Sequence, residues 1–138
     1  MLWLVFALIS AASAALTAIL AKVGVEGVPS TLATAFRTIV VAIIAWTLVV
    51  VLGEHRAMTA VSRRSYVFLA LSGVGTGISW LAYFRALQLG PASRVAPIDK
   101  LSLPLTVLLA TLVLSEKITW SVGLGVALMT IGALVTLL

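Results

Sequence analysis

Long runs of apolar residues, separated by short stretches of glycine, proline and charged residues, set the pattern of this chain. A helix needs about 20 residues to cross the hydrocarbon core of a bilayer, and five runs come near that length. These runs cover Leu2–Ala21, Leu32–Leu52, Tyr66–Leu89, Ser93–Ser115 and Ile118–Leu138. The pattern therefore predicts an all-α integral membrane protein that folds as a five-transmembrane-helix bundle.

The breaks between the runs are short. They consist of Gly24, Gly27 and Pro29, then Gly53–Arg64, then Gly90–Pro91, and finally Glu116–Lys117. Glycine and proline at such positions are typical of turns. None of the breaks is long enough to divide two folding units, so we expect one domain over residues 1–138. The first run has no basic region before it, which favours a retained helix over a cleaved signal peptide.

The composition supports the membrane assignment. Of the 138 residues, 62% are hydrophobic and 9% are charged, and the mean hydropathy is +1.25. A water-soluble domain could not cover that much apolar surface. The net charge of +5 comes from nine Lys and Arg against four Asp and Glu. Basic residues beside membrane spans explain this excess without a nucleic-acid partner, and we expect a multi-pass protein of the cell inner (cytoplasmic) membrane.

Asp99 and Lys100 precede an apolar run, Leu101–Ser115, that is too short to cross a bilayer alone. Its 15 residues reach roughly 22 Å, against a hydrocarbon core of roughly 30 Å. We therefore expect the charged pair at membrane depth or at its edge, where charged side chains usually face protein or a water-filled cavity. Pro97 and Pro104 flank the pair and predict a bent or interrupted helix. Because helix neighbours point about 100° apart, we expect Asp99 and Lys100 to have separate partners.

Other charges inside the spans lie at the same end of the predicted bundle. Arg37 lies about six residues inside the second span, and Arg85 lies about one turn before the end of the third. Long arginine side chains near helix ends often reach the headgroups, so snorkelling stays open for Arg85. Arg37 and Asp99 could pair between the second and fourth helices, either as a structural ion pair or within a substrate or proton site.

Trp80, Tyr83 and Phe84 follow on the third span near this charged end. They form either an interfacial aromatic belt or a wall on which a substrate stacks. The candidate substrate or coupling residues are Asp99, Lys100, Arg37, Arg85, Trp80 and Tyr83. The spans contain no His/Glu metal cluster, Ser/His pair or aspartyl dyad, so we expect neither catalysis nor a metal or other cofactor.

Two glycine patterns predict close helix contacts. In the third span, Gly73 and Gly77 form a G-x-x-x-G pattern, which serves either intramolecular packing or, together with Gly75, a flexible gating point. In the fifth span, Gly125 and Gly132 lie seven residues apart on one face and suit contact with another helix.

The distribution of basic residues hardly favours one orientation in the membrane. Four basic residues lie on one side of the predicted bundle and five on the other.

Several short motifs occur in an order that resembles a single EamA-type domain of the drug/metabolite transporter superfamily, over nearly the whole chain. They are Lys22 at the end of the first helix, Pro29, Arg37 within Ala-Phe-Arg, Tyr83–Leu87, Ala96–Pro97, and Ser115–Thr119 before a glycine-rich last helix. Most family members look like two such five-helix halves fused with inverted topology. For a chain with one half, the resemblance implies a dimer. The spacing of Gly125 and Gly132 is also similar to the dimer helix of small multidrug resistance transporters, although the first helix here lacks the acidic residue of those exporters.

These observations favour a secondary transporter that moves a small metabolite by alternating access, as a homodimer of five-helix protomers. Weak charge bias would permit an antiparallel arrangement, with Gly125 and Gly132 at the contact. The expected partners are a small-molecule substrate, the lipid bilayer and a second copy of the chain, with no nucleic acid. The alternative is a non-transporting membrane scaffold or a subunit of a heteromeric complex.

Overall fold

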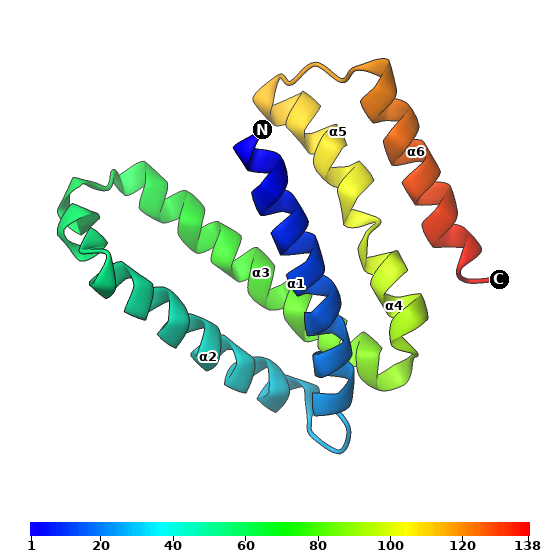
Figure 1. Ribbon diagram of the computed structural model, residues 1–138, viewed down its shortest axis with the longest axis horizontal. Coiled ribbons are helices and arrows are strands. Elements are labelled where there is room, and N and C mark those ends of the chain that lie inside the picture. Colours follow the sequence, from blue (N-terminus) through cyan, green and yellow to red (C-terminus); the bar gives the residue numbers. More distant parts are fainter. The chain divides into compact units, whose positions relative to one another are not determined.

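The computed structural model describes all residues 1–138, which form helices without strands. The elements are α1 (Leu2–Gly24), α2 (Ser30–Val51), the 3-10 helix η1 (Glu54–Ala60), α3 (Arg63–Leu89), α4 (Ala92–Asp99), α5 (Ser102–Leu114) and α6 (Trp120–Val135) (Figure 1). The all-α prediction is therefore confirmed.

Four segments are long and apolar enough to cross a membrane: α1, α2, α3, and α4 and α5 taken together. They correspond to the first four predicted runs. The last helix, α6, is apolar but has only 16 residues, or about 24 Å of helix. The predicted fifth span, Ile118–Leu138, is thus helical only in part. The fold is that of a multi-pass membrane protein with four candidate full-length spans and one shorter apolar helix.

The connection between α5 and α6 begins at Ser115. Ser115 adopts a left-handed backbone conformation with φ of 56°, which stops α5 at Leu114. The chain stays non-helical up to Thr119, whose hydroxyl caps α6 by accepting a hydrogen bond from the Val122 N–H at 3.4 Å. The connection before α6 is accordingly longer than the sequence pattern predicts.

The fourth predicted span is interrupted, as its prolines predict. Its first helix ends at Asp99 and its second begins at Ser102. Pro104 has no N–H group, and its ring would clash with the carbonyl four residues earlier, that of Lys100. That carbonyl instead accepts a hydrogen bond from the Leu103 N–H at 2.9 Å, an i→i−3 bond of the 3-10 type. The local chemistry of proline therefore accounts for the break.

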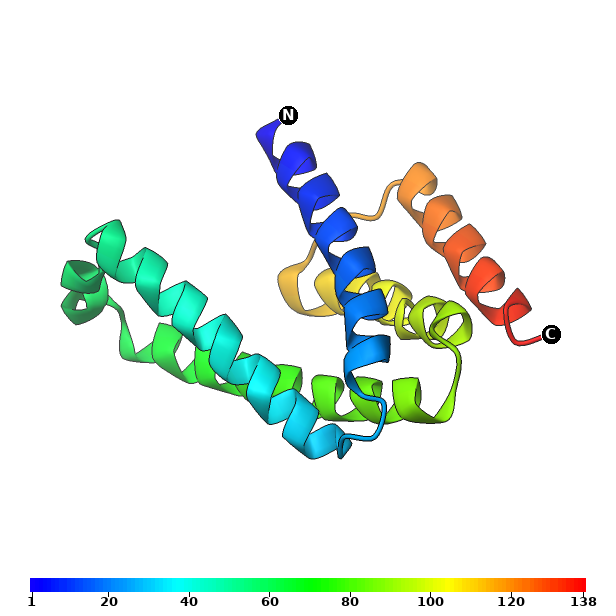
Figure 2. The same cartoon turned by 60° about the horizontal axis from the view of Figure 1, so that its bottom comes forward.

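The chain divides into two compact units. One comprises Met1–Leu20 and Leu89–Leu138, and in it α6 packs against both α4 and α5. The other comprises Ala21–Gln88 and contains the last turn of α1 followed by α2, η1 and most of α3. In this second unit η1 turns the chain back between α2 and α3 (Figure 2). We call them the terminal unit and the central unit, respectively.

The core of the central unit lies around the end of α1, the start of α2 and the end of α3. Leu87 is fully buried, and Val25, Thr34 and Phe84 are each at most 5% exposed. The short connection from α1 to α2 turns at Gly27, whose φ of 72° is a conformation that side chains disfavour. Tight packing is thus concentrated at one end of this unit.

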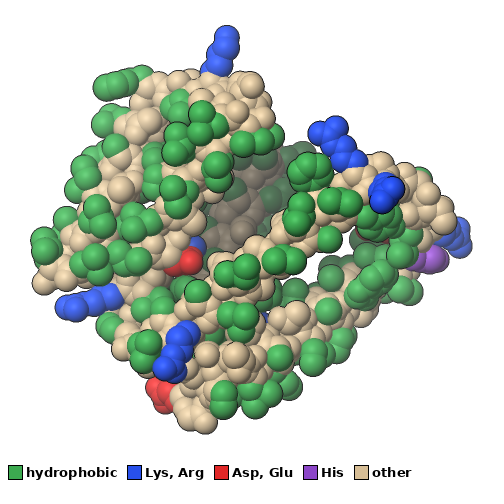
Figure 3. All heavy atoms as spheres, turned by 180° about the vertical axis from the view of Figure 1, so that it is seen from behind, with side chains coloured by type: hydrophobic (Ala, Val, Ile, Leu, Met, Phe, Trp, Pro, Cys, Tyr) green, Lys and Arg blue, Asp and Glu red, His purple; other side chains and the backbone are tan.

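Most other large apolar side chains are exposed. Figure 3 shows them in green over the visible surface of the helices, with basic side chains in blue toward the helix ends. A soluble monomer rarely carries so large an apolar surface. Facing lipid, the same surface is stable because the acyl chains are as apolar as the side chains.

Candidate functional site

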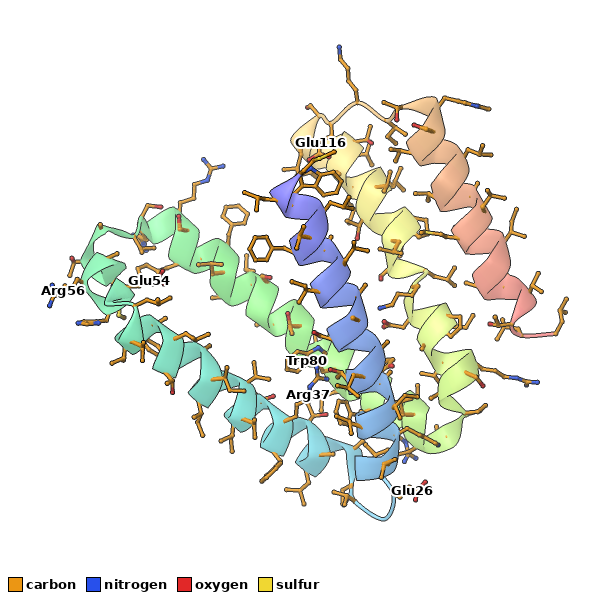
Figure 4. All side chains as sticks on the ribbon, viewed as in Figure 1. Glu26, Arg37, Glu54, Arg56, Trp80 and Glu116 are labelled. Carbon is orange, nitrogen blue, oxygen red and sulfur yellow. The ribbon has the colours of Figure 1, made fainter.

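Arg37 lies inside the second span, seven residues after α2 begins at Ser30, or about 10 Å along the helix axis. Its guanidinium carbon lies 4.1 Å from the centroid of the Trp80 ring and 5.6 Å from that of the Phe84 ring. Figure 4 shows Arg37 and Trp80 close together between α2 and α3. The electron-rich ring faces stabilise the cation where water is scarce, by about 0.5–2 kcal/mol.

Stacking leaves the edge of this guanidinium group available. Within the central unit, no acidic side chain pairs with Arg37 and no acceptor takes a hydrogen bond from it. Tyr83, on the same helix as Trp80, interacts electrostatically with Arg37. Because guanidinium N–H groups point outward in the plane of the group, they can bind a carboxylate or phosphate while the face stays on the ring. The central unit therefore presents the N–H edge of Arg37 beside the Trp80 and Phe84 rings.

Asp99 and Lys100 lie at the interruption between α4 and α5. The Lys100 Nζ lies 3.3 Å from the Asp99 Oδ2, so the expectation that each has a separate partner is wrong. The four-carbon lysine stem is long enough to curl back to its neighbour, although the two Cβ atoms point in different directions. The side chains are 55% and 35% exposed for Lys100 and Asp99, respectively. The terminal unit thus presents an accessible ion pair at a break in a membrane span.

A network of hydrogen bonds forms at the C-terminal end of α3. Gln88 Nε2 donates to the Val28 carbonyl at 2.5 Å, in the connection between α1 and α2. Arg85 donates to Gln88 Oε1 at 3.1 Å, and Lys22 Nζ donates to the Leu87 carbonyl at 2.6 Å. Carbonyls in the last turn of a helix have no partner within the helix, so the lysine satisfies one of them. Arg85 accordingly has a protein contact and does not depend on headgroups alone.

The six candidate residues fall in two places. Arg37, Arg85, Trp80 and Tyr83 belong to the central unit, whereas Asp99 and Lys100 belong to the terminal unit. The structure joins Arg37 to Trp80 and Arg85 to Gln88. A pair between Arg37 and Asp99 stays a prediction because these residues lie in different units.

Sequence reasoning missed the role of Gln88. The signal was present, because an amide in the last turn of an apolar helix must find hydrogen-bond partners to be stable there. Phe84 was expected with Trp80 and Tyr83 in an aromatic group, and it supplies the second ring near Arg37. The spacing of Trp80 and Phe84, four residues apart on one helix face, accounts for their shared contact.

The glycine faces are open. A Cβ atom built on Gly73, Gly75 or Gly77 would meet no neighbouring atom within 4 Å, so this G-x-x-x-G pattern has no packing partner within the central unit, and its role in packing or gating stays a prediction. A Cβ atom on Gly125 or Gly132 would also meet nothing within 4 Å. Each glycine face is therefore open within its own unit.

Comparison with known proteins gives a consistent result over the whole chain. The model of the EamA-like transporter family matches residues 1–138. An uncharacterized transporter in the cobO 3′ region of Sinorhizobium sp is 48% identical over 132 residues, covering 96% of this chain and 94% of that protein. No solved structure matches the chain. The similarity includes the interrupted span and α6 as well as the full-length helices.

Proposed function

This chain belongs to the EamA-like transporter family, and we propose that it is a secondary transporter of a small polar or amphipathic metabolite, working by alternating access in the cytoplasmic membrane. Family membership and the four apolar spans support membrane transport in general. The finer parts of the proposal depend on two features, the interrupted fourth span and the aromatic-bound Arg37.

The observation that carries the proposal is the Asp99–Lys100 ion pair at the break between α4 and α5. Non-helical backbone is tolerated at membrane depth only where protein or a water-filled cavity covers it. Broken helices beside charged residues are a common construction of transporter binding sites. Asp99 can take up a proton, and Lys100 then loses its partner and becomes available to an anionic substrate group. One pair can thus couple protonation to substrate binding.

Arg37 supplies a second binding element in the proposal. Its guanidinium group is held on the Trp80 ring with its N–H donors free of acceptors from the central unit. A substrate carboxylate or phosphate would bind those donors, and apolar parts of the substrate would contact the neighbouring aromatic rings. The proposed substrate class is therefore a small anionic or zwitterionic metabolite.

We further propose that two protomers assemble as a homodimer, with Gly125 and Gly132 of α6 at or near the contact. Alternating access in many transporters depends on two repeats that move against each other. A second copy would supply the second repeat. The open space at both glycines supports this role, because a helix from the other protomer can approach closely there.

Flux measurements in proteoliposomes test the function. Full-length protein is reconstituted and uptake is measured for radiolabelled metabolites that differ in charge, with and without a pH gradient. We expect saturable uptake of anionic or zwitterionic compounds that responds to the gradient. Lys117→Gln is the matched control, because it removes an exposed charge outside the helices. Absence of saturable uptake for every compound would favour the scaffold or subunit alternative.

A further inference from the structure

The connection between α2 and α3 concentrates positive charge. It contains Arg56 on η1 and Arg63 and Arg64 at the start of α3, and we call these three residues the arginine connector. All three are exposed, and Glu54 is the acidic residue in this stretch. Figure 3 shows blue basic side chains near the purple histidine of the same connection, and Figure 4 shows the labelled Arg56 at its outer edge.

Hydrogen bonds fix the backbone of the arginine connector. The Tyr66 hydroxyl donates to the Met58 carbonyl at 2.8 Å, which ties η1 to the first turns of α3. The Ser62 hydroxyl accepts a hydrogen bond from the Ser65 N–H at 3.0 Å and so caps α3. These contacts hold the backbone segments that carry the arginines in one arrangement.

The three arginines have no ion-pair partner within the central unit, although Glu54 lies in the same stretch. The guanidinium carbon of Arg64 lies 5.7 Å from the centroid of the Phe68 ring, a contact that uses its face and leaves its N–H donors free. Cations at the first turn of a helix are also disfavoured by the helix dipole. The arginine connector therefore favours an anion from outside the protein.

The position of the connector indicates the source of that anion. It joins the end of one membrane span, at Val51, to the start of the next, at Arg63, and so lies at the membrane surface. Met58 and Val61 are apolar and exposed in the same stretch. Basic groups beside apolar ones suit the boundary between headgroups and acyl chains. A soluble anion would make no use of the apolar residues.

We propose that the arginine connector binds the phosphodiester headgroup of an anionic phospholipid. Arginine is suited to phosphate because its N–H groups form paired hydrogen bonds with two oxygens. Each basic residue near an anionic membrane surface contributes about 1 kcal/mol of attraction. This site is separate from the proposed transport residues and does not depend on the transport proposal.

Native mass spectrometry of the detergent-solubilised full chain tests the site. Phosphatidylglycerol is titrated against phosphatidylcholine with the same acyl chains, for wild type and for Arg63→Gln/Arg64→Gln. The matched control is Arg94→Gln/Lys117→Gln, which removes the same charge from two exposed positions elsewhere. We expect wild type and the control to prefer phosphatidylglycerol, and the Arg63/Arg64 variant to bind it on the order of 20-fold more weakly.

A single change, Arg56→Gln, tests the same surface without altering a membrane span, and we expect a loss of about fivefold. Equal binding of the two lipids by wild type would overturn the proposal. So would wild-type binding of phosphatidylglycerol by the Arg63→Gln/Arg64→Gln variant with a normal helical circular-dichroism spectrum. Glycerol 3-phosphate serves as a soluble competitor that carries a phosphate ester but no acyl chains. If it displaces phosphatidylglycerol at equal concentration, the site recognises free phosphate esters and the lipid assignment is wrong.

Discussion

The guanidinium group of Arg37 lies 4.1 Å from the centroid of the Trp80 ring, so a cation inside a membrane span is stabilised by an aromatic face. The two residues come from α2 and α3 of the same compact unit. An ion pair would consume the hydrogen-bonding edge of the guanidinium group, whereas a ring occupies only its face. This relationship makes Arg37 suitable for binding a ligand as well as for holding the two helices together.

Replacing the Trp80 ring should show how much it contributes to the stability of the protein. We expect Trp80→Leu to destabilise the protein by about 0.5–2 kcal/mol, because the partly buried guanidinium group loses its contact with the Trp80 ring. Thermal unfolding in detergent, followed by circular dichroism, measures the effect. Trp80→Phe should retain part of the stability. Trp46→Leu is the control, since Trp46 is exposed on α2 and has no cation over its ring. Equal melting temperatures for the Trp80 and Trp46 variants would contradict a stabilising contact.

The Asp99 carboxylate, at the break between α4 and α5, should couple proton movement to transport. We expect Asp99→Asn to abolish transport or its pH dependence while the protein still folds, because the amide cannot take up or release a proton. Proteoliposome flux over a range of pH measures this, with circular dichroism as the test of folding. Glu116→Gln is the matched control, as it removes an exposed carboxylate from the connection before α6. Wild-type flux and an unchanged pH profile in Asp99→Asn would leave the carboxylate with a structural role at most.

Gln88 should matter for stability, although it is not a transport residue. The Gln88→Leu substitution leaves the Val28 carbonyl and the Arg85 side chain without the bonds seen in the structure. Losing the partner of the partly buried Val28 carbonyl costs about 1–3 kcal/mol, whereas Arg85 is exposed and can bind water instead. The free energy of unfolding in a denaturant titration provides the measurement. Leu89→Ala, at an exposed neighbouring position, serves as control and should have little effect. If both variants unfold alike, the Gln88 contacts contribute nothing measurable.

The glycine face of α6 should govern dimerisation. We expect Gly125→Leu/Gly132→Leu to weaken the dimer, and a Cβ atom at either position meets no neighbouring atom within 4 Å. Crosslinking and analytical ultracentrifugation in detergent measure association. Gly73→Leu/Gly77→Leu is the matched pair on α3, also open within the central unit. Loss of the dimer only with the α3 pair would place the contact on that helix instead.

Reporter fusions at the C-terminus address the orientation of the two protomers. A nearly even distribution of basic residues permits insertion both ways, so we expect signal from both sides of the membrane. A C-terminus found on one side in every molecule would exclude the antiparallel homodimer. A parallel dimer or a heterodimer would then be the better account.

Composition and local chemistry were enough to determine several features of this protein. The long apolar runs determine that the chain resides in a membrane, because transfer into lipid depends on the summed hydrophobicity of a segment and not on its neighbours. The break after Asp99 follows from Pro104, because a missing N–H group and a steric clash act within one helical turn. The order of the short motifs was also sufficient to indicate the transporter family.

Only the tertiary structure decided which groups meet. The stacking of Arg37 on Trp80 requires α2 and α3 to approach at one particular rotation, and no local pattern determines that rotation. The same holds for Gln88, whose partner Val28 lies sixty residues away in the chain. The glycines illustrate the limit most clearly, since Gly73 and Gly77 permit close packing but do not create a partner. A small residue removes a steric barrier, and whether a helix then fills the space depends on the energy of the whole assembly.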